Sequence, residues 1–264
     1  MKPQIDVLDH GFVKLVESWG SDEQVIEAAR MSTDKGFQGW GPFLCQDCNG
    51  DGWVDCRDPD NDIGPFTEKM CVKCKGHGST EGDERLLRYL WQHKHTTPFE
   101  MAGFSVEMQL PIFVAREIIR HRTFSFNELS ARYTPLPDLY YIPSIERLMA
   151  GKQATRNKQS SEMGFTEDQA CSLQYQIEAA TRQARAHYDT LLMQDLSREL
   201  ARLVIPVNQY TRWRMQGVLL NWLKFLTLRL PENVQWETRQ YAEAVASIVQ
   251  EKFPRTYSLF AEEK

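Results

Sequence analysis

The sequence predicts an α+β fold, with helices around a small, mostly antiparallel sheet and a small inserted module. Residues 104–110 alternate apolar and polar side chains, which is the period of a half-buried strand. Residues 167–194 fit one long helix, and further helices and strands alternate irregularly along the chain. One stretch in the N-terminal third loses this periodicity and is rich in Gly, Asp, Pro and Cys. We therefore expect a main domain at 1–36 and 82–264 and an inserted module at 37–81.

Capping residues and prolines mark the expected helix ends. Ser21 with Gln24 three positions later is a capping-box pattern that opens a helix to about Ser32. Asp83 is expected to cap a second helix, whose apolar residues share one face. The other expected elements are, in chain order, a strand within 4–17, a strand at 138–143, a polar loop at 150–165, a helix at 197–204 before Pro206, a strand at 207–216, a helix at 219–228 and a final helix from Pro231.

Composition excludes several classes of protein. The 264 residues are 42% hydrophobic and 25% charged, which is ordinary for a globular protein with a sizeable core. A net charge of −5 gives no global attraction to nucleic acid. No apolar run is long enough to span a membrane, and residues 1–10 lack the pattern of a signal peptide. We expect a cytoplasmic protein without a nucleic-acid or membrane partner.

Four cysteines form a repeated metal-ligand motif. Cys45 and Cys48, like Cys71 and Cys74, begin the pattern C-x-x-C-x-G-x-G. Two residues between thiolates let one turn present both to a metal, and the glycines permit the tight backbone that follows. Four thiolates suit tetrahedral zinc with no open position, so we predict a structural zinc site. The repeat resembles the zinc-binding cysteine-rich region of DnaJ chaperones, over these two octets alone.

The alternative for these cysteines is a pair of disulfides or unmetallated thiols, which a chain without a secretion signal disfavours. Cys56 has no partner at motif spacing and is interpreted as a spectator, and Cys171 stands alone. His77 occupies the position that Asp51 has in the first octet, so we interpret it as a solvated loop residue.

The segment from Arg120 to Tyr133 is the most informative for chemistry. It holds three arginines, one histidine, one glutamate and four hydroxyl groups in fourteen residues, beside apolar side chains that place it against protein. A guanidinium group offers a planar fork that binds phosphate or carboxylate with two bonds. Ser130 beside Arg132 suits a phosphate, and Glu128 suits a sugar hydroxyl or an arginine. A solvated charge run at a helix end is the alternative interpretation.

The order Arg-His-Arg, seven residues, then Ser resembles the signature of flavin-dependent thymidylate synthases, the ThyX family. The resemblance implies a ThyX-like fold and covers nearly the whole chain except the cysteine-rich insert and the 150–165 loop. Its further landmarks, in family order, are Ile5 to Val13, His95 to Glu100, Pro111 to Arg116, Tyr141 to Pro143, Ala201-Arg202, Tyr210 to Arg212, Phe225 to Arg229 and Gln235 to Glu237.

This resemblance implies an activity, its cofactors and an assembly. Such enzymes convert dUMP to dTMP, with methylenetetrahydrofolate as carbon source, NADPH as reductant and FAD as hydride carrier. The family forms homotetramers whose active sites draw on several subunits. The implied dUMP contacts are Glu117, Arg120, Glu128, Ser130, Ala131, Arg132, Arg202 and Arg229. The implied FAD contacts are Thr97, Arg120, His121, Arg122, Glu128 and Lys224.

The residues themselves are consistent with a flavin route. Carbon transfer to C5 of uracil needs electron density at that carbon, and Arg229 near the pyrimidine edge would stabilise negative charge on N3 and O2. We therefore predict Arg229 as the catalytic residue. No cysteine stands in a context that suits a thiolate nucleophile, and no G-x-G-x-x-G follows a strand. Among the histidines, His95 ranks below His121 as a flavin contact.

Three departures from the family pattern keep other functions open. Glu117 stands at a position where the family commonly has Gln. Val218-Leu219-Leu220 stands where the family often has an Asn-x-Arg group that contacts FAD, and Lys224 stands where Asn or His is frequent. One alternative is a related enzyme that methylates or hydroxymethylates dCMP. The other is a zinc-bearing binding protein that has lost catalysis. Three tryptophans are interpreted as core residues rather than cofactor platforms: Trp213, Trp222 and Trp236.

Overall fold

The structure is a computed structural model that describes residues 4–55, 68–153 and 161–263. It separates into two compact units, one of Met1–Trp19 and Gly103–Pro254, the other of Gly20–Ala102 and Arg255–Lys264. The predicted inserted module lies within the second unit. Cys56 and the middle of the predicted 150–165 loop lie outside the described residues. Within the described ranges, no helix is both long enough and apolar enough to span a bilayer.

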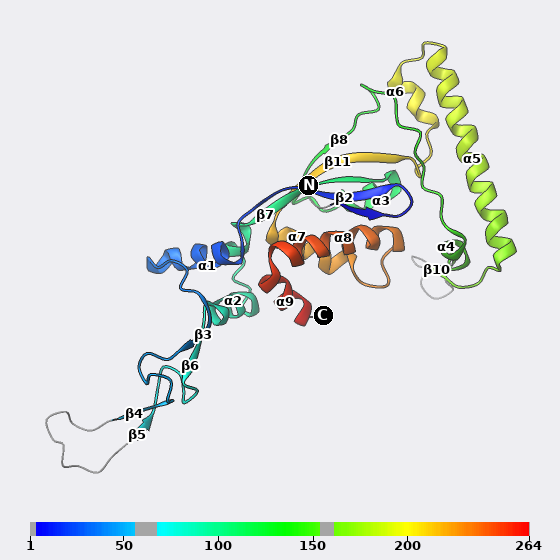
Figure 1. The fold of residues 1–264 in the computed structure, drawn as a ribbon. Coiled ribbons are helices and arrows are strands. Elements are labelled where there is room, and N and C mark those ends of the chain that lie inside the picture. Colours follow the sequence, from blue (N-terminus) through cyan, green and yellow to red (C-terminus); the bar gives the residue numbers. More distant parts are fainter. Residues whose placement is uncertain (1–3, 56–67, 154–160, 264) are drawn as a thin grey trace, which may run out of the picture. The chain divides into compact units, whose positions relative to one another are not determined.

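A five-stranded antiparallel sheet forms the centre of the first unit (Figure 1). In spatial order its strands are β1 (Gln4–Val7), β2 (Gly11–Trp19), β7 (Gly103–Pro111), β11 (Tyr210–Val218) and β8 (Ser125–Glu128). The predicted strand at 104–110 is confirmed as the central strand β7. Its apolar residues Phe104, Val106 and Met108 are fully buried, because alternate side chains of a strand point to the same face.

Helices α7 (Leu219–Arg229) and α8 (Trp236–Lys252) pack on this sheet. Trp222 donates its indole N–H to the backbone oxygens of Phe104 at 3.2 Å and Gly217 at 3.0 Å. Its ring stacks on Phe104 with centroids 4.4 Å apart and an interplanar angle of 8°. Since α7 also begins directly where β11 ends, the helix is fixed to two neighbouring strands. This attachment sets the position of its last residue, Arg229.

The remaining elements of the first unit connect and flank the sheet. Helix α5 (Glu167–Met193) confirms the predicted long helix, and its capping box is formed by Thr166 and Gln169. It packs on α4 (Ile145–Met149), α6 (Arg198–Ala201) and the 3-10 helix η3 (Arg202–Val204). The predicted helix at 197–204 is thus divided into α6 and η3. The others are α3 (Ile112–Ile118) and the paired strands β9 (Lys152–Gln153) and β10 (Ser161–Glu162).

The second unit combines short helices with two short strand pairs. Its helical elements are α1 (Asp22–Arg30), η1 (Met31–Thr33), α2 (Asp83–Gln92), η2 (Thr97–Glu100) and most of α9 (Pro254–Glu262). Strand β3 (Trp40–Leu44) pairs with β6 (Ser79–Gly82), and β4 (Trp53–Asp55) pairs with β5 (Glu68–Met70). The sequence shows no apolar periodicity there because these strands bury little apolar surface.

Several predicted elements require correction. Residues 138–143 form no regular strand and contribute one bridge, between Tyr140 and Gln209. The last sheet-covering helix begins at Trp236 rather than at Pro231, and α9 follows it. Ser21 caps α1 as predicted, since its hydroxyl accepts from the Gln24 N–H. The predicted cap of α2 is wrong: Gly82 is its N-cap, and the Asp83 side chain binds elsewhere.

Replacing Trp222 with Phe is expected to lower the free energy of unfolding by about 1–3 kcal/mol, because the two buried N–H···O contacts disappear while much of the ring packing stays. Urea denaturation followed by circular dichroism measures the change. Trp53→Phe is the control: Trp53 is 51% exposed, so its replacement should shift stability by no more than about 0.5 kcal/mol. Equal losses in the two variants would contradict the anchoring role of Trp222.

Candidate functional site

Arg229, the last residue of α7, is held by two other residues predicted for the site. Its Nε donates to His121 Nε2 at 2.9 Å, and its Nη2 donates to the backbone oxygen of Glu117 at 2.9 Å. Its Nη1 lies 3.6 Å from the Glu117 carboxylate oxygen Oε2. Glu117 belongs to α3, and His121 lies in the turn after it. Two segments distant in sequence are therefore joined at one half-buried guanidinium group.

The contact with Arg229 fixes the protonation of His121. A guanidinium N–H only donates, so Nε2 of His121 accepts and the ring proton resides on Nδ1. Burial, and secondly the positive charge of Arg229, lower the pKa of His121 below its ordinary value. The ring also packs edge-on against Phe225, with centroids 5.0 Å apart. His121 is therefore a neutral imidazole at pH 7 with an Nδ1–H donor.

A second group of predicted residues lies at the edge of the sheet, around the end of β8. Glu128 Oε1 accepts from the Thr211 hydroxyl at 2.6 Å. The Ser130 hydroxyl accepts from the backbone N–H of Arg132 at 3.3 Å, which shapes the turn. Arg132 Nε lies 3.2 Å from Glu199 Oε2, with both side chains 53% exposed. Its guanidinium group is thus ordered near a partner yet accessible to an anion.

The other predicted site residues are scattered more widely. Ala131 is buried, whereas Arg120, Arg122, Arg202 and Lys224 are exposed. Across the described ranges, no hydrogen bond or ion pair joins these four cations to the Arg229 or the Glu128 group. Thr97 is exposed on η2, which belongs to the second unit. The structure therefore brings together two groups, Glu117–His121–Arg229 and Glu128–Ser130–Arg132.

The start of α7 lacks the polar groups that the resemblance associates with FAD. Val218 ends β11, and Leu219 and Leu220 begin α7 with buried side chains. Apolar side chains here pack into the core and offer no donor to a cofactor. The exposed guanidinium groups of Arg120 and Arg122 remain as donors for the phosphates of a flavin nucleotide. The donor set therefore fits the phosphates of FAD through the Arg-His-Arg turn rather than through the first two residues of α7.

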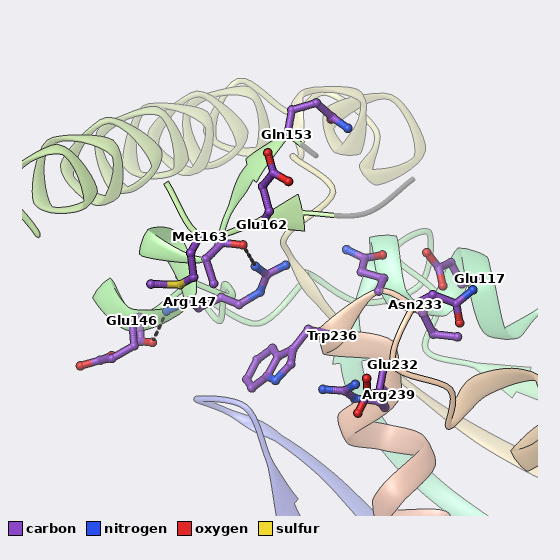
Figure 2. Close-up of a pocket in the computed structure, with 14 residues that line it drawn as sticks. Glu117, Glu146, Arg147, Gln153, Glu162, Met163, Glu232, Asn233, Trp236 and Arg239 are labelled. Carbon is purple, nitrogen blue, oxygen red and sulfur yellow. Dashed lines mark hydrogen bonds between the residues drawn. The ribbon is translucent and has the colours of Figure 1, made fainter. Parts of the chain in front are cut away.

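A cavity of about 700 Å³ opens beside Glu117 (Figure 2). Figure 2 shows Glu117 and Asn233 at one side of it and Glu146 and Arg147 at the other. Arg147 is anchored by a hydrogen bond of 2.7 Å, which its Nε donates to the buried carboxylate of Glu237. The residues that line the cavity come from segments far apart in sequence, so no motif spacing could have indicated it.

Trp236 also lines this cavity, with the Arg147 guanidinium group 5.8 Å from its ring centroid. It is 37% exposed, so the prediction that it is a core residue is wrong. The same prediction is confirmed for Trp213 and Trp222, which are buried. Two sequence signals lie at this cavity, Glu117 and the family-like Gln-Trp-Glu triplet that begins at Gln235, and neither indicates that Trp236 is exposed.

The second unit contains a further cavity, of about 690 Å³. It lies at the C-terminal ends of α1 and α2 and along the segment that leads into η2. Predicted Thr97 and the lower-ranked His95 both contribute to it. The lining residues are Ala28, Ala29, Met31, Leu90, Lys94, His95, Thr96, Thr97, Pro98 and Met101.

The four motif cysteines form one buried cluster in the second unit. Cys45 and Cys71 have their sulfurs 3.7 Å apart, Cys48 and Cys74 have theirs 3.6 Å apart, and all four lie within 4.8 Å of one another. Zinc–sulfur bonds of about 2.3 Å in a tetrahedron place sulfurs about 3.8 Å apart, so the cluster fits zinc. These separations exceed a disulfide bond, and the four thiols are free.

Backbone amides complete the surroundings of the cluster. The N–H of Gly52 donates to Cys48 Sγ at 3.2 Å, and the N–H of Gly78 donates to Cys74 Sγ at 3.3 Å. Both glycines have positive φ, of 81° and 72°, which explains their place in the repeat. Although burial opposes it, the Gly78 N–H and the neighbouring thiols lower the pKa of Cys74 to about 7. These contacts favour thiolate, the form that binds a metal, at Cys74, whereas burial raises the pKa of Cys45 to about 11.

Comparison with known proteins identifies the class to which this fold and site belong. The family model described as Thymidylate synthase complementing protein matches residues 14–255. The chain therefore belongs to the thymidylate synthase complementing protein family.

Particular relatives agree along almost the whole chain. A flavin-dependent thymidylate synthase of Thermus thermophilus is 38% identical over 258 residues, which are 98% of this chain and 78% of the relative. One of Wolbachia pipientis is 34% identical over 256 residues, with 97% and 75% covered. The crystal structure of a UMP/dUMP methylase, PolB, from Streptomyces cacaoi bound with 5-Br dUMP superposes with a TM-score of 0.73 at 27% identity, covering 98% of this chain and 97% of that one. This neighbour confirms the predicted α+β, ThyX-like fold.

Replacing Arg229 with Met is expected to raise the pKa of His121 toward its ordinary value of 6.5, because the cationic neighbour is removed while burial remains. Since the folded pKa lies below the unfolded one, His121 contributes stability that is complete above pH 6.5 and is lost as the pH falls through the folded pKa. Long-range ¹H–¹⁵N NMR of the imidazole reports both the pKa and the tautomer. A parent protein with its proton on Nε2 would contradict the donor role of Arg229.

Proposed function

We propose that this protein is a flavin-dependent thymidylate synthase that converts dUMP to dTMP, with methylenetetrahydrofolate as carbon source, NADPH as reductant and FAD as cofactor. The observation that carries the proposal is the Glu117–His121–Arg229 cluster in a chain of this family. A cationic donor beside a neutral imidazole suits a pyrimidine ring on which negative charge develops. Stabilisation of this charge requires no thiolate nucleophile from the enzyme.

Each residue of the site has a distinct part in the proposed reaction. Arg229 donates to O2 of the uracil ring and stabilises the negative charge that develops on N3 and O2 as the carbon is transferred to C5. Ser130 and Arg132, which are accessible, bind the nucleotide phosphate. The Nδ1–H of His121 would be a donor to the cofactor, and Arg122 would bind cofactor phosphate. When bound, FAD supplies the hydride chemistry, and Thr97 and Lys224 are proposed as further contacts to it.

We also propose that the protein is a homotetramer. The region around Arg202 exposes apolar side chains, of which Leu203 is 77% exposed, with Leu200 and Val207 beside it. Exposed apolar side chains next to a predicted substrate residue favour cover by another protein surface. A second copy of the chain would bury this region and bring Arg202 to a nucleotide bound mainly by a neighbouring subunit.

A second candidate function follows from Glu117, whose carboxylate stands where the family commonly has an amide. A carboxylate only accepts when ionised, so it favours a nucleotide with an additional donor. The exocyclic amine of dCMP and the 2′-hydroxyl of UMP are such donors. The solved neighbour from Streptomyces cacaoi is a methylase of UMP as well as of dUMP, so UMP belongs among the substrates to test. Incubation with dUMP, UMP and dCMP in the presence of folate, and identification of products by mass, separates these functions.

The four-cysteine cluster is proposed to bind one structural zinc ion. All four positions of a tetrahedral ion are filled by Cys45, Cys48, Cys71 and Cys74, so no position is left for a substrate or for water. The ion would hold together two turns that the short strands around them stabilise only weakly.

Arg229→Ala is expected to lower kcat for dTMP formation by about 10²–10³-fold, as loss of one charge-stabilising donor does. Arg132→Ala should weaken dUMP binding by about 10–100-fold, because a charge-assisted phosphate contact is lost. Product analysis by mass spectrometry and calorimetric titration with dUMP provide the measurements. Arg182→Ala, which removes only an exposed pair with Glu178, is the control. Parent-like binding and turnover in Arg229→Ala would refute the mechanism, and protein that cannot be reconstituted with FAD would support a binding protein without catalysis.

Elemental analysis of the purified chain is expected to give one zinc per chain. Cys48→Ser should lower that content and the thermal unfolding temperature together, because zinc binding contributes directly to folding. Cys171→Ser is the matched control, since Cys171 is exposed on α5 and does not belong to the four-cysteine cluster. A zinc content equal in the parent and Cys48→Ser proteins would show that the metal binds elsewhere.

A further inference from the structure

A two-stranded ribbon connects the four-cysteine site to α1 and α2 within the second unit, and Figure 1 labels its strands β3 and β6. β3 ends directly before Cys45, and β6 begins directly after Gly78. The N–H of Cys45 donates to the Gly78 oxygen at 2.9 Å, and the N–H of Gly78 donates to Cys74 Sγ. A metal bound by the four thiolates therefore holds the two strand ends together.

The ribbon contributes little stability of its own. It has three paired positions, interrupted by an irregularity after Trp40. The side chains of Phe43 and Leu44 on β3 are exposed, so the ribbon buries little apolar surface. An isolated pair of strands is marginally stable in water. The order of the ribbon therefore depends on its two ends, one at the cysteines and the other at α2.

At that second end, Asp83 joins three segments at one buried carboxylate. It is the first residue of α2 and is 0% exposed. One of its oxygens accepts from the Arg30 guanidinium group, with Nε at 2.9 Å and Nη2 also in contact. Its other oxygen accepts from the Gln38 N–H at 2.6 Å, and its own N–H donates to the Gly39 oxygen at 2.9 Å. The end of α1, the segment that leads into β3 and the start of α2 are thereby fixed to one another.

The two helices joined by Asp83 form walls of the 690 Å³ cavity. Ala28 and Ala29 line it and directly precede Arg30 in the last turn of α1. Leu90 lines it from α2, and α1 packs on both α2 and η2, which carries Thr97. The contact between Arg30 and Asp83 therefore determines where one wall of the cavity lies relative to the other.

We propose that Asp83 is a positioning residue that couples metal occupancy of the four-cysteine site to the shape of this cavity. With the metal bound, the ribbon is closed, Gln38 and Arg30 both reach Asp83, and α1 holds the cavity open for its ligand. Without the metal, the ribbon frays from the cysteines toward Asp83, and the last turn of α1 loses its fixed partner. That the ligand is the flavin ring rests on the proposed function.

Trp40 provides a second attachment of the ribbon, which gives a matched comparison. Its indole N–H donates to Glu23 Oε1 at 2.8 Å, at the start of α1, and the Arg255 guanidinium group lies 4.4 Å from its ring centroid. Since this attachment is at the end of α1 that does not line the cavity, Trp40→Phe should preserve the coupling. Asp83→Asn should abolish it.

The test measures FAD affinity by fluorescence titration in the full chain, loaded with zinc or treated with a chelator. Chelation is expected to weaken FAD binding at least tenfold in the parent, and dUMP affinity in flavin-free protein should change less than twofold. Zinc-loaded Asp83→Asn should bind FAD as weakly as the chelated parent and still contain one zinc per chain. Chelation of this variant should then change FAD affinity less than twofold, which is the non-additivity of coupled positions.

Arg30→Lys provides a second variant if Asp83→Asn does not fold. Lysine keeps the charge and lacks the two-pronged donor. Chelation should therefore weaken FAD binding less than it does in the parent, while the zinc content of the variant stays the same. Arg88→Ala, which removes an exposed α2 pair with Glu262, should keep the full parental response. A parental response in both Asp83→Asn and Arg30→Lys would overturn the proposal, as would FAD affinity that chelation leaves unchanged in the parent.

Hydrogen exchange of flavin-free protein separates the coupling from the proposed function. Chelation should accelerate amide exchange in the last turn of α1, near Arg30, and in η2, more than in the first turn of α1. If this response occurs and no form of the protein binds FAD, the proposed function fails and the coupling stands. If FAD binds and exchange near Arg30 is unaffected by chelation, the coupling is wrong and the proposed function stands.

Discussion

The donor-only character of the Arg229 guanidinium group constrains the rest of the site. Every group that holds it must accept, which places the His121 proton on Nδ1 and uses the backbone oxygen of Glu117. A cation fixed by acceptors is useful only if the helix that carries it cannot shift. The Trp222 contacts with two strands meet this requirement, because they attach α7 to the centre of the sheet. Core packing and site chemistry thus share one element.

The sequence predicted best those features whose physical cause is local. The alternation in β7, the Ser21 cap and the repeated cysteine pairs each act over a few residues, and the structure contains all three. Strand β8 was not predicted, because its residues Ser125–Glu128 are mostly exposed and lack an apolar alternation. Their pairing with β11 supplies the backbone order that the sequence pattern does not show.

Features that depend on contacts between distant segments could be predicted from the sequence only in part. Resemblance to a family indicated Glu117, His121 and Arg229 separately, yet their mutual contact joins the end of α3 and the turn after it to a residue more than a hundred positions later in the chain. Asp83 shows the limit in another way. Its type and position predict a helix cap, but burial beside Arg30 gives the carboxylate a stronger partner than the helix amides. The local preference of an aspartate to cap a helix is therefore overridden where a tertiary ion pair is available.

Under the proposed function, the unequal partners of the Arg229 nitrogens indicate which atom would receive the nucleotide. Nε and Nη2 are engaged at 2.9 Å, by His121 and by the Glu117 backbone oxygen. Nη1 has its nearest carboxylate oxygen, from Glu117, at 3.6 Å, which is beyond a strong charge-assisted bond. A nucleotide that binds at Nη1 would therefore displace a weak contact and leave the two strong ones in place. Glu117 also lines the adjacent cavity, so the displaced carboxylate becomes available to a donor on the substrate. Under the proposed function, Glu117 would thus bear on which nucleotide is accepted, while the orientation of the Arg229 guanidinium group is set by other contacts.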